Sequence, residues 1–146
     1  MKVAISACLL GRACRYDGTD NLNASLLEKL KGAELIPFCP EDHAFGTPRP
    51  PMDLIASGTP ERIEAVCSKS AAILSSPIRS YAKAFFDQHS DVNLCIGKDR
   101  SPSCGVCSAK VYDASHRLIS GTAAGLMAQE AMDREIPCID AEQYAL

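Results

Sequence analysis

The chain has 146 residues, 47% of them hydrophobic, which predicts a single domain with one core over residues 1–146 and argues against a disordered or fibrous protein. The formal net charge is −3 and no run of Lys or Arg stands out, so a polynucleotide partner is not favoured. No apolar stretch is long enough for a secretion signal or a membrane-spanning helix, and we therefore expect a cytoplasmic protein without a membrane partner.

The first half of the chain alternates short apolar segments with polar ones. Residues 2–6 and 34–38 predict two buried strands. Residues 23–31 between them predict a short helix with three leucines on one face. Residues 43–51 are rich in proline and glycine, so we expect an irregular segment that wraps over a neighbouring part of the chain. Residues 54–75 show no clean period.

The middle of the chain predicts a longer helix and a third strand. Ser76 followed by Pro77 favours a helix start, with Ser76 as the N-cap and Pro77 at the first helical position. Apolar and aromatic residues recur behind them at helical spacing. Residues 92–96 are apolar and predict a buried strand, and a polar loop over residues 97–105 follows them.

The last third completes an alternating pattern. Residues 109–112 and 117–119 predict a hairpin, Thr122 is expected to cap a helix that ends at Arg134, and residues 136–139 predict a terminal strand. This order of strands and helices predicts an α/β fold, namely a Rossmann-like three-layer domain with a mainly parallel sheet. In such sheets, ligands bind at the carboxyl ends of the strands.

Three cysteines are expected at that edge of the sheet. Cys8 follows the first strand, Cys39 follows the second, and Cys104 lies in the loop after the third. Thiolates are soft ligands that suit zinc or iron–sulfur clusters, and a site with only three protein ligands keeps a position open for substrate. On spacing alone, three buried core cysteines explain the pattern equally well.

The chain has eight cysteines, and without a secretion signal they do not indicate a disulfide framework. Cys104 and Cys107 form a CxxC pair, which is typical of a zinc half-site or a redox pair but also arises by chance. The remaining four are interpreted as core residues: Cys14, Cys67, Cys95 and Cys138.

Polar residues near these cysteines are candidates for catalysis and binding. Glu41 lies close to Cys39, and a carboxylate shielded there by the proline-rich segment would suit proton transfer, whereas a solvated loop acid is the commoner case. Ser101 and Ser103 flank a proline before Cys104 and are expected to orient substrate or water, or to form a tight turn. Arg49 stands between prolines and is expected to bind an anion or carbonyl, or to pair with Asp17 or Glu41.

Five motifs together resemble one known family. They occur in chain order as Ser6-Ala-Cys-Leu-Leu-Gly11, Arg15-Tyr-Asp-Gly18, Cys39-Pro-Glu41, Thr47-Pro-Arg-Pro-Pro51 and Arg100-Ser-Pro-Ser-Cys-Gly105. On these motifs the chain resembles the TudS-like thiouracil desulfidases, and the similarity runs from the N-terminus to about Gly125.

The resemblance implies a 4Fe-4S cluster held by Cys8, Cys39 and Cys104, with one open iron. It also implies that Glu41 and Ser101 are the catalytic acid and serine. The expected reaction removes sulfur from a small thiolated compound of the 2-thiouracil type: its thiocarbonyl sulfur binds the open iron, water replaces sulfur at carbon, and hydrosulfide leaves without net redox chemistry. The expected substrate-binding residues are Ser103, Arg49 and Asp17.

Other functions are compatible with parts of this pattern. A cluster or zinc protein without catalysis, such as a sensor or sulfur carrier, would keep the cysteines but would not need Glu41 or Ser101. A persulfide sulfurtransferase would use Cys104 or Cys107 and would work without iron. A relative that acts on thiolated tRNA is disfavoured by the acidic balance of the chain.

Overall fold

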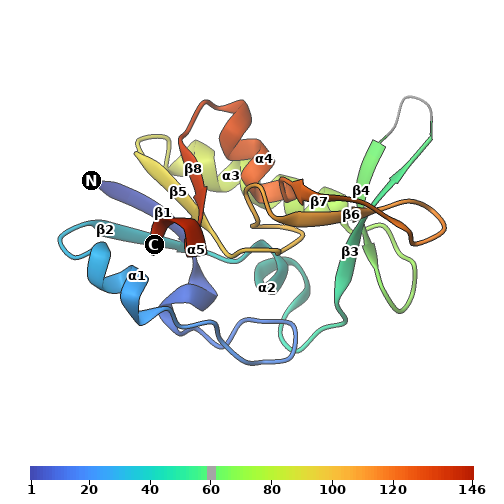
Figure 1. Cartoon of the computed structure of the whole chain (residues 1–146), viewed down its shortest axis with the longest axis horizontal. Coiled ribbons are helices and arrows are strands. Elements are labelled where there is room, and N and C mark those ends of the chain that lie inside the picture. Colours follow the sequence, from blue (N-terminus) through green and yellow to red (C-terminus); the bar gives the residue numbers. More distant parts are fainter. Residues whose placement is uncertain (59–61) are drawn as a thin grey trace.

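The computed structural model describes residues 1–58 and 62–146, which form two four-stranded sheets with helices around them (Figure 1). The parallel sheet has the order β2-β1-β5-β8 and consists of β1 (Lys2–Ser6), β2 (Glu34–Phe38), β5 (Leu94–Gly97) and β8 (Cys138–Asp140). The second sheet has the order β4-β3-β6-β7 and consists of β3 (Met52–Ser57), β4 (Arg62–Cys67), β6 (Ala109–Tyr112) and β7 (Leu118–Ala123). The helical segments are η1 (Ala7–Leu10, a 3₁₀ helix), α1 (Ala24–Lys29), α2 (Pro40–Phe45), α3 (Ser75–Gln88), α4 (Leu126–Asp133) and α5 (Ala141–Tyr144).

Helices cover both faces of the parallel sheet. On one face, Val3 and Ile5 of β1 pack in a core with residues of α1 and α5. On the other face, Ala4 and Phe38 pack against α3 and α4. A central parallel strand is buried on both faces, which is why β1 is a continuous apolar run. The structure therefore confirms the predicted α/β, three-layer architecture.

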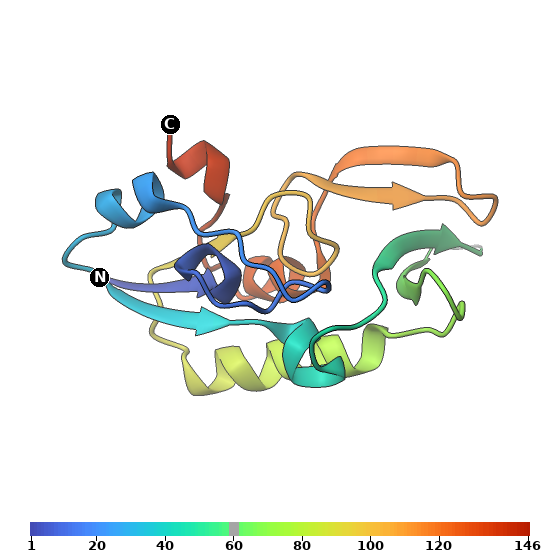
Figure 2. The same cartoon turned by 90° about the horizontal axis from the view of Figure 1, so that it is seen from below.

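The second sheet explains the segment 54–75, for which the sequence showed no period. Its described residues form the antiparallel hairpin of β3 and β4 and lead into α3, while residues 59–61 lie outside the described residues. The predicted hairpin of β6 and β7 is confirmed, and it joins this sheet through parallel pairing of β6 with β3. Leu54 and Val111 pack there against Ile78 of α3. Figure 2 shows α3 running along the molecule from the parallel sheet to the second sheet.

Two helix starts differ from the prediction. The N-cap of α3 is Leu74 rather than Ser76, because the Ser75 hydroxyl accepts the Ala65 backbone N–H at 2.8 Å and joins the helix start to β4. Thr122 does not cap α4, because it belongs to β7, where pairing with β6 keeps the chain extended. The N-cap of α4 is Gly125.

The segment after the second strand is more regular than expected. Residues 43–51 were predicted to be irregular throughout, but α2 continues to Phe45. Pro40 at its first position and the acids Glu41 and Asp42 in its first turn favour a helix start. No helix in the described part of the chain is long and apolar enough to cross a membrane.

Candidate metal centre

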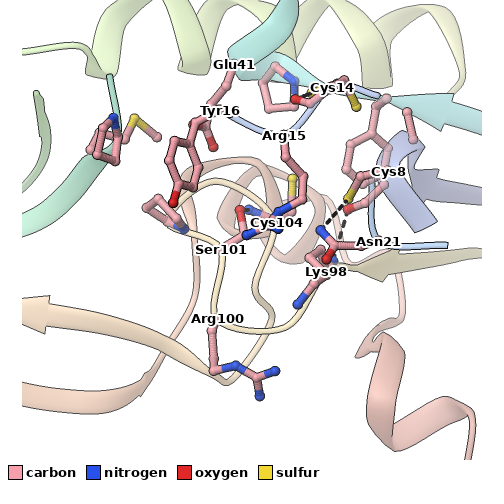
Figure 3. A pocket seen from close by; sticks show the side chains of 18 of the residues that line it. Cys8, Cys14, Arg15, Tyr16, Asn21, Glu41, Lys98, Arg100, Ser101 and Cys104 are labelled. Atoms are coloured by element: carbon pink, nitrogen blue, oxygen red, sulfur yellow. Dashed lines mark hydrogen bonds between the residues drawn. The ribbon is translucent and has the colours of Figure 1, made fainter. Parts of the chain in front are cut away.

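The three predicted cysteines converge, as the strand order required. Cys8 lies in η1 directly after β1, Cys39 is the N-cap of α2 directly after β2, and Cys104 lies in the loop after β5. Since β1 pairs in parallel with both β2 and β5, all three thiols reach the same edge of the sheet. They line one cavity of about 420 Å³ (Figure 3).

A fourth thiol lines the same cavity. Cys14 was interpreted as a core residue, and its residue surface is only 2% exposed, but it faces the cavity beside Cys39. The Cys39 thiol lies 3.8 Å from the Cys14 carbonyl oxygen. Cys95 and Cys138, which were also interpreted as core residues, lie opposite each other in the paired strands β5 and β8.

Burial dominates the electrostatics of these thiols. It raises the pKa of Cys8 and, more strongly, the pKa of Cys104. Burial, followed by the neighbouring charge of Cys39, raises the pKa of Cys14 to about 12. Thiols in such surroundings ionise readily only when a cation is bound close to them.

The loop that carries Cys104 is held from two sides. The Ser101 hydroxyl oxygen accepts the backbone N–H groups of Ser103 at 3.3 Å and Cys104 at 3.0 Å. With both lone pairs occupied, this hydroxyl acts toward the cavity as a donor. On the other side, the first N–H groups of α4 donate to the loop, including that of Met127 to the Ser103 carbonyl at 2.8 Å.

Glu41 extends from α2 and forms part of the cavity wall, and its side chain is 14% exposed. One carboxylate oxygen accepts the Ser103 hydroxyl at 2.9 Å, and the other lies 3.6 Å from Nε of Arg49. Ser103 is fully buried and does not line the cavity. The structure thus gives Ser103 a different partner from the expected substrate.

Arg49 joins three segments of the site. Its side chain is 6% exposed, and its guanidinium donates to the carbonyl oxygens of Cys14 at 2.8 Å and Gly46 at 3.1 Å. Arg49 thus binds carbonyl groups of the protein itself, and it pairs with Glu41 rather than with Asp17. Its Nε is buried and has no hydrogen-bond partner among the described residues, so the ionic contact with Glu41 is what it faces.

Two sequence candidates lie away from the cavity. Asp17 does not line it, because its carboxylate accepts the backbone N–H of Thr19 at 3.1 Å and the Thr19 hydroxyl at 2.6 Å in an exposed turn. Cys107 is exposed, and its thiol lies 3.2 Å from a carboxylate oxygen of Asp140. The CxxC pair therefore does not act as a unit in this cavity.

Several cavity residues were not predicted from the sequence. Arg15, Tyr16, Asn21 and Lys98 line the wall together with the cysteines (Figure 3). Arg15 and Tyr16 belong to a motif that was recognised, so that motif was their signal. Nothing in the sequence pointed to Asn21 or Lys98, because only tertiary contacts bring them to the cavity.

The donor set fits an iron–sulfur cluster better than a single ion. In residues 1–58 and 62–146, no three His, Cys, Asp or Glu side chains are grouped closely enough to hold one metal ion. Thiolates that bind different irons of a cluster stand further apart than ligands of one ion, and four soft thiols line this cavity. Cys8, Cys39 and Cys104 would hold such a cluster, with Cys14 beside them.

Comparisons with known proteins agree with this geometry. The chain is similar to the "Uncharacterized protein YbbK" of Bacillus subtilis (strain 168), with 26% identity over 133 residues that cover 86% of each chain. Among solved structures, it is similar to the 4Fe-4S-dependent thiouracil desulfidase TudS, with a TM-score of 0.75 and 27% identity over 97% of this chain and 91% of that one. The family described as 2-thiouracil desulfurase matches residues 3–143. The chain therefore belongs to the 2-thiouracil desulfurase family.

Proposed function

We propose that this protein removes sulfur from a small thiolated compound of the 2-thiouracil type, using a 4Fe-4S cluster held by Cys8, Cys39 and Cys104. The observation that carries the proposal is the convergence of these thiols with Glu41 and Ser101 around one cavity. Family membership and the similarity to TudS support the same reaction. When bound, the cluster supplies a soft Lewis acid for the thiocarbonyl sulfur.

Glu41 is the proposed proton carrier. Its position in the cavity wall places a carboxylate where a water molecule beside the substrate can lose a proton to it. The carboxylate accepts the Ser103 hydroxyl and pairs with Arg49, so its orientation does not depend on the substrate. Ser103 and Arg49 are therefore proposed as positioning residues.

Ser101 is the proposed hydrogen-bond donor to the reacting group. Its oxygen already accepts two backbone N–H groups, so its proton is directed to an acceptor in the cavity, such as a ring oxygen, ring nitrogen or water. Tyr16 adds an aromatic ring to the wall, which suits contact with a planar base.

The overall reaction is balanced without an oxidant or reductant. Water supplies the oxygen that replaces sulfur at carbon, the carbon–sulfur bond breaks, and the sulfur leaves as hydrosulfide. The protons of water end on hydrosulfide and on the solvent, with Glu41 as the intermediate carrier. No electrons are gained or lost.

The test is anaerobic reconstitution with iron and sulfide, followed by measurement of hydrosulfide and uracil formed from 2-thiouracil. We expect both products from the wild-type protein and from Cys67→Ala, whose thiol lies outside the cavity, and neither product from Cys104→Ala. A fully loaded cluster without either product would contradict the proposed reaction and favour a non-catalytic cluster protein. Equal rates with and without iron would favour persulfide chemistry instead.

A further inference from the structure

Asn21 contacts Cys8 with both its backbone and its side chain. The backbone N–H donates to the Cys8 carbonyl at 2.9 Å, and the side-chain amide nitrogen lies 3.4 Å from the Cys8 sulfur (Figure 3). A thiolate can only accept, so it faces the amide N–H group rather than the amide oxygen. The contact is a hydrogen bond to one of the proposed cluster ligands.

Main-chain hydrogen bonds hold the backbone of Asn21 next to Cys8. The Asn23 N–H donates to the Leu9 carbonyl at 3.0 Å, so residues 21–23 lie alongside η1 through two main-chain hydrogen bonds. Asn21 is partly buried and lines the cavity. The backbone of Asn21 is therefore fixed with respect to Cys8 by the fold, which keeps the side-chain amide within reach of the sulfur.

Ser6 lines the same cavity as Cys104. Its side chain is buried, and its hydroxyl oxygen accepts the Lys98 backbone N–H at 3.0 Å, so the hydroxyl proton is left for an acceptor in the cavity that Cys104 also lines. Cys39 differs from both, since its sulfur faces the Cys14 carbonyl oxygen, which is an acceptor. Cys8 thus has a neutral donor in hydrogen-bond contact, Cys104 has one that lines the same cavity, and Cys39 has none of this kind among the described contacts.

We propose that Asn21 and Ser6 are positioning residues that tune the cluster by donating hydrogen bonds to the thiolates of Cys8 and Cys104. This inference rests on the proposed cluster. A hydrogen bond to a thiolate withdraws electron density that the sulfur would otherwise give to iron, and such bonds are among the determinants of cluster reduction potential. The same withdrawal makes the iron a stronger acceptor for the sulfur of the substrate.

The experiment is a spectroelectrochemical titration of the reconstituted cluster, followed by electron paramagnetic resonance. Asn21→Ala and Ser6→Ala are compared with the wild-type protein, and Asn93→Ala is the matched control, because Asn93 contacts Lys2 at the opposite end of β1. We expect each of the two site variants to shift the reduction potential to a more negative value, the double variant to shift it by about the sum of the two, and Asn93→Ala to leave it unchanged.

Asn21→Asp provides a second variant of nearly equal size that keeps the backbone contact. Because its carboxylate cannot donate and adds negative charge, we expect a larger negative shift than for Asn21→Ala, and it replaces Asn21→Ala if that variant holds no cluster. Unchanged potentials in fully loaded Asn21 and Ser6 variants would overturn this inference and leave the proposed function intact. A wild-type protein that forms no cluster would overturn both.

Discussion

Each oxygen of the Glu41 carboxylate faces a different neighbour, the Ser103 hydroxyl at 2.9 Å and the Arg49 guanidinium at 3.6 Å. Both neighbours are suited to the ionised carboxylate, which is the form that accepts a proton from water. Neither of them is held by the substrate, so the base is oriented before substrate enters.

Replacing Glu41 with Gln keeps the size of the side chain and removes the proton carrier. We expect the rate of hydrosulfide release to fall by about 10²–10⁴-fold, the usual contribution of a positioned general base, while the iron content stays at the wild-type level. The measurement is the turnover rate on 2-thiouracil together with iron per chain.

Asp42→Asn is the matched control for this substitution. Asp42 is the next residue in α2, and its carboxylate accepts the Thr47 hydroxyl rather than lining the cavity. We expect it to retain near-wild-type turnover. Full activity of Glu41→Gln would show that another group moves the proton.

At the scale of elements, the site depends on close contact between β5 and the loop of Cys104. A side chain at Gly97, the last residue of β5, would place its first carbon 1.7 Å from the Cys104 carbonyl oxygen. At Gly125, the N-cap of α4, the same atom would lie 2.4 Å from the Ser103 carbonyl carbon. Both glycines are therefore explained by the approach of this loop.

Gly97→Ala should displace Cys104 from its position. We expect a loss of stability of about 1–3 kcal/mol or more from overpacking, and iron binding well below the wild-type level. Urea unfolding and iron analysis measure the two effects. Gly121→Ala is the control, because an added carbon at Gly121 meets no atom within 4 Å. Equal iron binding in the two variants would contradict this account of the loop.

Asp140 anchors the other end of the same loop. It is 3% exposed, and its carboxylate accepts the N–H groups of Val106 at 2.8 Å and Cys107 at 3.0 Å and the Ser108 hydroxyl at 2.9 Å. Burial alone would raise the pKa of Asp140, but these hydrogen bonds outweigh it and lower the pKa below its ordinary value. The folded state therefore favours the ionised carboxylate.

The sign of the pH dependence follows from this shift. Because the pKa is lower in the folded state, the contribution of Asp140 is present above the unfolded value of about 3.9 and is lost as the pH falls through the folded value. We expect Asp140→Asn to reduce the free energy of unfolding by about 1–3 kcal/mol at pH 6, and by less at pH 3. Urea unfolding at the two pH values checks this. A difference that does not shrink on acidification would contradict it.

At the scale of the molecule, the sequence was most informative where one strand is buried on both faces. The apolar runs of β1 and β2 predicted the parallel sheet and, through it, the convergence of Cys8 and Cys39. The β3–β4 hairpin of the second sheet was missed because Ile55 and Ile63 are apolar but point outward in part, which hides the alternation of the two strands.

Within the site, too, some features could be predicted from the sequence and others could not. Glu41 and Ser101 were found from motifs that are local in the sequence. The contact of Glu41 with Ser103 and that of Cys8 with Asn21 were not, because Ser103 is 62 residues from Glu41 and Asn21 is 13 residues from Cys8, and no local pattern encodes such contacts. Cys14 was assigned to the core, and its residue is buried, but it also lines the cavity.

The central claim, an open iron at a three-thiolate cluster, is tested most directly by Mössbauer spectroscopy of protein reconstituted with ⁵⁷Fe, before and after addition of 2-thiouracil. We expect a 4Fe-4S spectrum in which one iron differs from the other three and changes when the thio-substrate is added, because that iron has no cysteine and takes the sulfur. A spectrum that substrate leaves unchanged, with four equivalent irons as a fourth thiolate such as Cys14 would produce, would contradict the account.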